Sequence, residues 1–370
     1  MGTGTGSSRI ASLDQFRGYT VAGMFFLNFV GGYLLVPAIF KHHKIYCSYA
    51  DTIMPQFFFA VGFAFRLTFL KNVERLGRWK ASKKAIMRSL GLILVGLVIY
   101  HLDGGGLSWK QLSELGIDGF LSTAFRRNIF QALVHIGLTC IWILPVIGAR
   151  PLIRILFLCI SGAAHLILSQ VFYFEWARAT NVIDGGQLGF MTWTIPTLVG
   201  SLAYDVFLAR GPKGSIKRLG VWSVVLMAAG YGISCLTAIK HSLAMGISSI
   251  SGYLMEPPFV PPGRPIDVWT MSQQTGSISY LIFAAGFSLA VYVICIILSD
   301  IKGVEIGIFR TLGQNALAGY IIHGSVGDAV SEFVPKDAPL WYVGAGFLVF
   351  FWITWFMLRY LEKKQIYLRL

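Results

Sequence analysis

Long runs of apolar residues, separated by short polar segments, dominate this chain. Ten of the runs hold about 20 residues, the length that an α-helix needs to cross the hydrocarbon core of a bilayer. They cover residues 18–40, 52–70, 86–102, 129–147, 152–174, 188–208, 221–239, 279–298, 312–334 and 340–361. The pattern predicts an all-α, polytopic membrane protein with about ten transmembrane helices.

The composition agrees with this prediction. The chain is 55% hydrophobic and only 13% charged, and its mean hydropathy is +0.65. An ordinary soluble domain carries about twice that share of charged residues. The longest polar connections are too short to bury a core of their own. We therefore expect a cytoplasmic N-terminal tail at residues 1–17 and a single transmembrane domain at 18–370. The first apolar run is expected to stay as a helix and not to be removed as a signal peptide.

The charges indicate the topology. Most of the 31 Lys and Arg residues fall in the N-terminus and in every second connection, such as residues 71–88 and 210–218. Positive residues favour the cytoplasmic side, so both termini are expected there. Most of the net charge of +14 is then the excess of Lys and Arg on the cytoplasmic side, which membrane insertion and contact with anionic lipids favour. Nucleic acid is therefore not an expected partner. The five cysteines show no C-x-x-C spacing, which argues against a metal site.

Two adjacent histidines, His42 and His43, lie in a short loop between the first two apolar runs, and Asp51 follows shortly after. Topology places this loop on the outer side. An imidazole has a pKa of about 6.5 and suits a general base near neutral pH. A carboxylate can orient such a ring and stabilise its charged form. Two adjacent histidines at a membrane boundary are a poor choice for packing, so a catalytic role is the favoured explanation.

Three polar residues interrupt apolar runs, where uncompensated polar groups are costly and often mark a lined cavity. Asn28 lies ten residues past Gly18, near the middle of the first span. Asn315 and His323 lie eight residues apart, about two helical turns, on a similar face. The alternative for Asn28 is a hydrogen bond to a neighbouring helix. The alternative for His323 is a ring near the outer end of a span that hydrogen-bonds to lipid headgroups or water.

Asp14 and Arg17 flank the start of the first span. One explanation is a helix-start acid with a positive-inside anchor. The other is contact with an anionic cofactor, since a guanidinium matches phosphate geometry.

Several motifs, taken in order, resemble the heparan-α-glucosaminide N-acetyltransferase family, whose wider relatives are the transmembrane acyltransferases. The resembling segments are SLDQFRG at 12–18, Asn28, the His-bearing loop, ADTIMPQFFFAVG at 50–62, residues 127–131, DGGQLGFMTWTIPTLVG at 184–200, and residues 313–323. Together they touch most of the chain. The chain resembles a bacterial-type member of this family, one that has no large luminal domain.

The resemblance implies transfer of an acetyl group from cytoplasmic acetyl-CoA to the amino group of a terminal glucosamine on the far side of the membrane. By position in the motif, His42 carries the role of the catalytic histidine, and His43 remains an open alternative. The chain departs from the family after this histidine, where Lys44 and Ile45 follow, and at Gln56, where an aromatic residue is usual. These departures leave the acceptor open between an amino sugar and a sugar hydroxyl.

The site expected from these residues has His42 as base or acyl carrier and Asp51 as its orienting carboxylate. Asn28 and Asn315 line the site and could stabilise an oxyanion, an effect of about 3 kcal/mol per donor, while His323 assists near the substrate. The residues expected to hold the donor are Asp14, Arg17, Arg127 and Gln131.

The expected co-substrate is acetyl-CoA, and no metal is expected. The expected partners are the amino sugar or glycan acceptor and membrane lipid, with a homodimer left open. The expected location is the cell membrane as a multi-pass protein, which is the inner membrane in a Gram-negative cell. A solute transporter is the main alternative, although no paired, interrupted half-repeats are evident. A non-catalytic membrane scaffold would leave the outward histidines unexplained.

Overall fold

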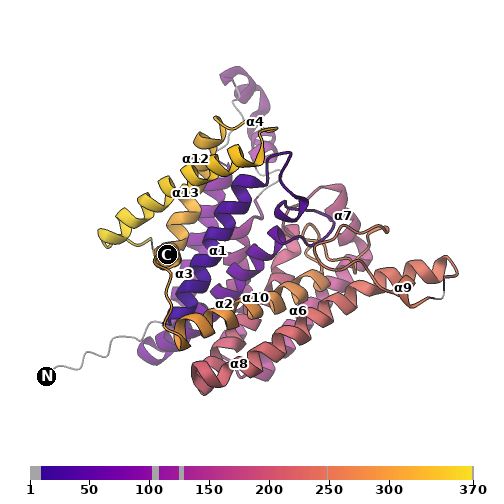
Figure 1. Cartoon of the computed structure of the whole chain (residues 1–370), viewed down its shortest axis with the longest axis horizontal. Coiled ribbons are helices and arrows are strands. Elements are labelled where there is room, and N and C mark those ends of the chain that lie inside the picture. The colour runs from indigo at the N-terminus through magenta and orange to yellow at the C-terminus, as the bar shows by residue number, and fades with distance from the viewer. Residues whose placement is uncertain (1–9, 102–107, 125–128, 248, 369–370) are drawn as a thin grey trace. The chain divides into compact units, whose positions relative to one another are not determined.

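The protein is mostly helical in the part that a computed structural model describes, which is residues 10–101, 108–124, 129–247 and 249–368. These residues form helices and connecting loops without a strand (Figure 1). The helical stretches long and apolar enough to cross a membrane are Ala50–Leu76, Pro151–Ala179, Gly186–Ala244, Ile278–Ile301 and Leu340–Lys363. The all-α prediction is confirmed for the described residues. The count of about ten spans and the side of the termini stay predictions.

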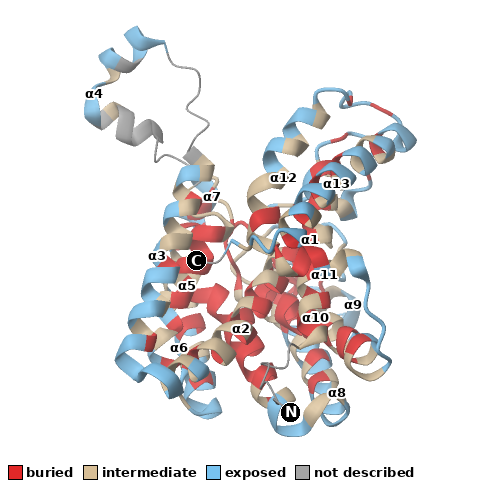
Figure 2. Cartoon of the chain, turned by 90° about the vertical axis from the view of Figure 1, so that its left-hand side faces the viewer, coloured by how far each residue is buried: buried red, intermediate tan, exposed pale blue. Residues whose placement is uncertain are grey.

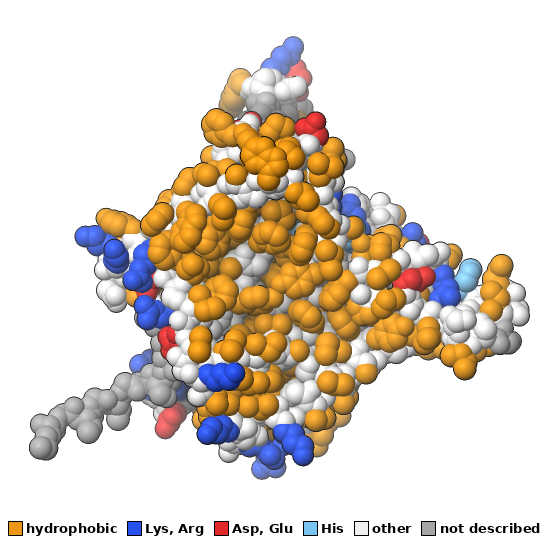
Figure 3. Space-filling view, in the orientation of Figure 1, with side chains coloured by type: hydrophobic (Ala, Val, Ile, Leu, Met, Phe, Trp, Pro, Cys, Tyr) orange, Lys and Arg blue, Asp and Glu red, His pale blue; other side chains and the backbone are white. Residues whose placement is uncertain are grey.

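Large apolar side chains lie on the outside of several helices. Helix α6 (Pro151–Leu168) exposes Leu152 and Ile160, and α13 (Leu340–Lys363) exposes Trp341 and Phe356. Hydrophobic side chains cover most of the face drawn in Figure 3, and Lys and Arg gather near its margins. Such a surface is unfavourable in water and is the surface expected of helices in contact with lipid tails.

The chain divides into two compact units, and each is assembled from separate stretches of sequence. The first unit holds residues up to 41, 205–225 and 286–369, and the second holds 42–204 and 226–285. Two helices, α8 (Gly189–Ala244) and α10 (Ile278–Cys295), contribute residues to both units. The predicted boundary between a tail at 1–17 and a single domain at 18–370 stays a prediction.

In the first unit, α1 (Ala11–Val30) packs against α11 (Gly307–Gln314), α12 (Ala316–Ser331) and α13. Its crossing with α11 is very close. A Cβ added at Gly18 would lie 1.9 Å from the carbonyl oxygen of Phe309, and one at Gly313 would lie 2.2 Å from that of Asp14. Glycine is needed at both positions because the two backbones touch.

The second unit is built around α2 (Ile53–Leu76), which packs against α3 (Arg78–His101) and α5 (Ala132–Ile147). Figure 2 shows buried residues along α2 and many exposed ones on α6. A Cβ at Gly62 would lie 1.7 Å from the carbonyl oxygen of Thr197, so α2 and α8 also meet backbone to backbone. The remaining helices of this unit are α4 (Trp109–Ala124), α7 (Phe174–Ala179) and α9 (Ile250–Tyr253).

Helix α1 begins and ends earlier than the apolar run predicted. It starts at Ala11, inside the predicted tail, and it ends at Val30 ahead of Gly31 and Gly32. Polar residues of its first turns are buried: the Gln15 amide donates to the carbonyl of Ile306 (3.2 Å) and accepts from the N–H of Ile306 (3.1 Å). Hydropathy misses this start because these polar groups are satisfied inside the unit.

The basic connections are mostly helical as well. A single residue, Gly77 with φ of +79°, separates α2 from α3, and Gly211 with φ of +66° breaks α8 into two consecutive helices. Glycine adopts this left-handed conformation without steric cost, so the chain changes direction within one residue. The lysines and arginines of residues 71–88 therefore extend the ends of α2 and α3 and do not form a loop.

Candidate active site

The His42 side chain lies against a buried carboxylate in the second unit. Its Nδ1 is 2.9 Å from Oδ1 of Asp51. The His42 side chain is 47% exposed, whereas that of Asp51 is fully buried. With Nδ1 donating to the carboxylate, Nε2 is the ring nitrogen left to accept a proton.

The carboxylate of Asp51 is held by several hydrogen bonds. Its Oδ2 accepts from the backbone N–H and the hydroxyl of Ser48, both at 2.9 Å, and from the N–H of His43 at 3.4 Å. Ser48 Oγ in turn accepts from the N–H of Asp51 at 3.3 Å. This is the reciprocal pattern of a capping box, at the start of the helical stretch Ala50–Leu76. Sequence reasoning missed Ser48, although the S-x-x-D spacing before an apolar run is a signal for it.

The two adjacent histidines have different surroundings. The ring of His43 stacks on Tyr46, with ring centroids 4.3 Å apart and an interplanar angle of 23°. Its backbone N–H contacts Oδ2 of Asp51. This geometry favours His42 over His43 as the base, and the roles themselves stay predictions.

The charge state of His42 is set by opposing effects. Burial lowers its pKa, but the hydrogen bond to Asp51 and the negative charges of Asp51 and Asp184 raise it, and the net pKa lies above the ordinary 6.5. Asp184 is a site residue that sequence reasoning did not single out, although it begins one of the resembling motifs. It is buried, and its Oδ1 accepts from the side-chain amide of Gln273 at 2.7 Å.

The other expected polar pair meets in the first unit. Asn28 Nδ2 lies 3.1 Å from Nε2 of His323, and Nδ1 of His323 lies 2.6 Å from the carbonyl oxygen of Tyr320. A carbonyl only accepts, so Nδ1 carries the hydrogen and Nε2 accepts from the Asn28 amide. The ring also stacks on Phe25, at 5.5 Å and 14°. The ring of His323 is thus held at both of its nitrogens.

Two sequence arguments about these residues were wrong. Asn28 lies in the last turn of α1 and not near the middle of its helix, because the helix ends at Val30. Asn315 does not share a continuous helix with His323, because its own φ of −114° and ψ of 31° separate α11 from α12. Its buried amide donates to the carbonyl oxygen of Thr311 at 3.2 Å. Its expected place in the lining of the site stays a prediction.

The residues expected to hold the donor are only partly described. Asp14 and Arg17 lie half-buried in the first turns of α1, in the first unit. Gln131 directly precedes α5 in the second unit, and its carbonyl accepts from the N–H of His135. Arg127 lies outside the described residues. Their expected role in holding the donor stays a prediction.

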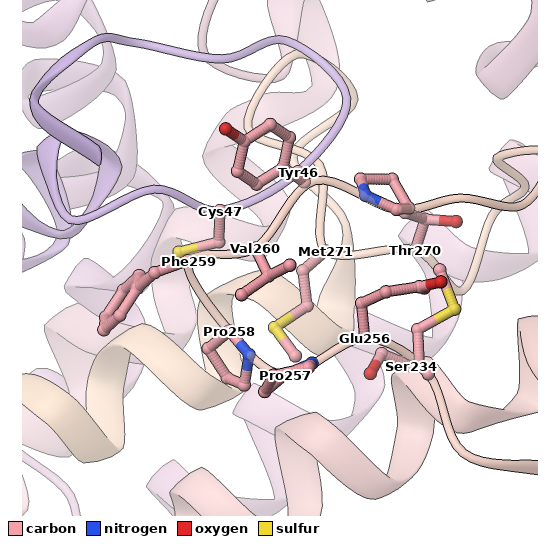
Figure 4. A pocket seen from close by; sticks show the side chains of 12 residues that line it. Tyr46, Cys47, Ser234, Glu256, Pro257, Pro258, Phe259, Val260, Thr270 and Met271 are labelled. Carbon is pink, nitrogen blue, oxygen red and sulfur yellow. The ribbon is translucent and has the colours of Figure 1, made fainter. Parts of the chain in front are cut away.

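A small cavity lies beside the histidine loop (Figure 4). Its lining includes Tyr46 and Cys47 from that loop, with Glu256, Pro257 and Met271 from the long connection before α10. The volume is about 20 Å³, which is room for about one water molecule. This cavity is too small for a sugar, and neither His42 nor Asp51 lines it.

A search of curated proteins finds a distant relative of this chain. No protein-family model matches the chain. The heparan-alpha-glucosaminide N-acetyltransferase of Mus musculus is 30% identical over 115 residues. The similarity supports a distant relationship to that N-acetyltransferase. The aligned part is 30% of this chain and 17% of the mouse protein, so the chain spans less than a fifth of its relative. With the apolar helices, this relative indicates a membrane protein and suggests a transferase.

Proposed function

We propose that the protein is a membrane-embedded acyltransferase that moves an acetyl group, or a similar acyl group, from acetyl-CoA to an amino sugar or a sugar hydroxyl. The observation that carries the proposal is the His42–Asp51 pair, an exposed imidazole whose Nδ1 faces a fully buried carboxylate. This arrangement leaves Nε2 as a base and stabilises the imidazolium that forms when the base takes a proton. The distant transferase relative supports the same class of reaction.

In the proposed reaction, Nε2 of His42 takes a proton from the acceptor N–H or O–H as that atom attacks the thioester carbonyl. The new N–C or O–C bond forms, the C–S bond breaks, and the electron pair leaves with the sulfur of coenzyme A. The proton held by His42 then passes to this thiolate. A two-step route, in which the imidazole itself carries the acyl group, uses the same residues.

The finer parts of the proposal concern topology and donor binding. We propose about ten spans with both termini in the cytoplasm, so that the histidine loop faces outward and the acetyl group crosses the cell membrane. Asp14 and Arg17, at the cytoplasmic start of the first span, are proposed to hold acetyl-CoA, whose phosphates suit a guanidinium group. The same topology places Arg127 on the outer side, with Gln131 just after it, away from phosphates that bind at the cytoplasmic face. The Asn28–His323 pair and Asn315 are proposed to assist near the substrate.

The test uses purified protein in lipid nanodiscs with acetyl-labelled acetyl-CoA and a panel of amino sugars and glycans. His42→Ala is expected to lower the transfer rate at least ~100-fold, the usual contribution of a general base. His43→Ala should stay within about threefold of wild type, since the ring of His42 is the one paired with Asp51 and that of His43 stacks on Tyr46. A wild-type protein that transfers no acyl group, or a His42→Ala variant of full activity, would refute the proposal. Solute uptake by proteoliposomes without transfer would favour a transporter.

A further inference from the structure

Three consecutive residues before α10 join the histidine loop to the loop that carries Asp184. Ser272 Oγ donates to the carbonyl of Lys44 at 2.6 Å, and Gln273 Nε2 donates to Oδ1 of Asp184 at 2.7 Å. The carbonyl of Gln274 accepts from the backbone of the same loop, at the N–H of the residue after Asp184 (3.1 Å). Because neighbouring Cα atoms lie only 3.8 Å apart, these contacts hold the two loops side by side.

A second connection runs through two aromatic side chains. The hydroxyl of Tyr280 donates to the carbonyl of Asp51 at 2.6 Å, and the indole N–H of Trp193 donates to the carbonyl of Asp184 at 2.7 Å. The two rings meet edge to face, with centroids 6.2 Å apart. The backbones of both carboxylate residues are therefore tied to one buried pair of rings.

The backbone of Asp184 is itself unusual. Its φ is +56°, in the left-handed region that residues other than glycine rarely adopt. Such conformations persist where the surrounding structure holds them, and they concentrate at functional sites. The carboxylate of Asp184 is buried, and it lies close enough to His42 and Asp51 for their charges to act on it.

Asp184 is one of several ionisable groups in this cluster. Burial raises its pKa most and the charge of Asp51 raises it further, while the charge of His42 and the hydrogen bond from Gln273 lower it, and the net pKa is about 7. The titratable or charged side chains near it or its loop are those of His42, Lys44, Cys47, Asp51, His135, Tyr173 and Tyr280.

We propose that Asp184 is a second proton acceptor of the site, which takes the first proton from an acceptor that arrives as an ammonium ion. The inference rests on the proposed acyl transfer. An ammonium group must lose one proton before its nitrogen can attack and a second as the amide forms. A hydroxyl acceptor loses only one. One base, His42, is enough for a hydroxyl, whereas a cationic amine needs two acceptors.

The proton balance assigns one step to each residue. The Asp184 carboxylate takes a proton from R–NH₃⁺ and becomes a neutral acid, leaving R–NH₂. The amine nitrogen then attacks the thioester carbon, the C–S bond breaks toward sulfur, and Nε2 of His42 takes the second proton. A carboxyl with a pKa of about 7 is well matched to a primary amine with a pKa near 8.

The test compares glucosamine with glucose as acceptors, because the two sugars differ only in an amine or a hydroxyl at one ring carbon. Asp184→Asn removes the proton acceptor while keeping the shape, and asparagine tolerates the left-handed backbone. At pH 7 only about a tenth of an amine with a pKa near 8 is neutral, so kcat/KM for glucosamine should fall about tenfold. At pH 9 the loss should shrink to less than about twofold, because the amine no longer needs the first acceptor. Asp337→Asn, at an exposed loop position, is the control for the same chemical change.

Several outcomes would overturn the proposal. An Asp184→Asn variant that loses the same factor at pH 7 and pH 9, or equally for glucose, would show a structural role. An unchanged variant, or a wild type that acylates glucose alone, would also reject it. A wild type without transfer to either sugar would remove the proposed function and this inference together.

A second variant covers the case in which Asp184→Asn does not fold. Gln273→Met removes the donor that lowers the pKa of Asp184 and adds no charge. The carboxylate should then need a higher pH to ionise, and the pH at which glucosamine transfer reaches half its maximum should rise. No shift in a folded Gln273→Met variant would contradict the proposal.

Discussion

Substituting Asp51 by asparagine should abolish most activity while leaving the fold in place. In the protein, Oδ2 of Asp51 accepts from three donors, two on Ser48 and one on His43, whereas Oδ1 accepts from the His42 ring alone. An asparagine has one oxygen and one NH₂ group to meet these two sides. Turning the oxygen toward the three donors places the NH₂ group against Nδ1 of His42.

The ring must then change its tautomer, and this removes the base. Nδ1 would accept from the new amide, so the hydrogen would move to Nε2, which could no longer take a proton. The opposite orientation keeps the tautomer, and the Ser48 hydroxyl can rotate to accept from the NH₂ group. The backbone N–H groups of Ser48 and His43 would lose their acceptor, at about 1–3 kcal/mol each. The active arrangement is therefore disfavoured by about 2–6 kcal/mol, and the transfer rate should fall at least ~30-fold.

The assay is the initial rate of transfer from labelled acetyl-CoA, with the melting temperature measured on the same sample. Asp337→Asn again serves as the matched control and should keep the wild-type rate. An Asp51→Asn protein that melts like wild type and works within threefold of its rate would refute the argument that Asp51 sets the His42 tautomer.

Three further predictions concern the pKa of His42, the close helix crossing at Gly62, and the hydrogen bond between Asn28 and His323. The pKa of His42 is raised and a base acts when neutral, so the wild-type rate for a hydroxyl acceptor should rise with pH to a midpoint above 6.5; a midpoint below 6 in a pH–rate profile would contradict this. Gly62→Ala should destabilise the protein by about 3 kcal/mol or more through backbone overlap, whereas Gly232→Ala, with no atom within 4 Å of the new Cβ, should be neutral or stabilising in thermal melts. Asn28→Ala and His323→Ala should show a coupling of about 1 kcal/mol in a double-mutant cycle on stability, and strictly additive effects would reject their hydrogen bond.

Local contacts of the site could be predicted from the sequence, and distant ones could not. His42 and Asp51 are nine positions apart in one loop, so their spacing alone makes contact plausible. Gln273 and Asp184 are 89 positions apart, and no periodicity relates them. The amide of Gln273 identifies Asp184 as a partner of the site only once both loops have packed.

The sequence by itself determined that the chain is helical and apolar, because run length and residue type act locally and need no partner. It also marked the histidine loop and its carboxylate. Only the tertiary structure decided where α1 begins and ends, that Asn315 interrupts a helix, and that Asn28 bonds to His323 from 295 positions away. These outcomes depend on which buried polar groups find partners and on where glycine lets two backbones touch, and both are settled by packing between segments that are remote in the sequence.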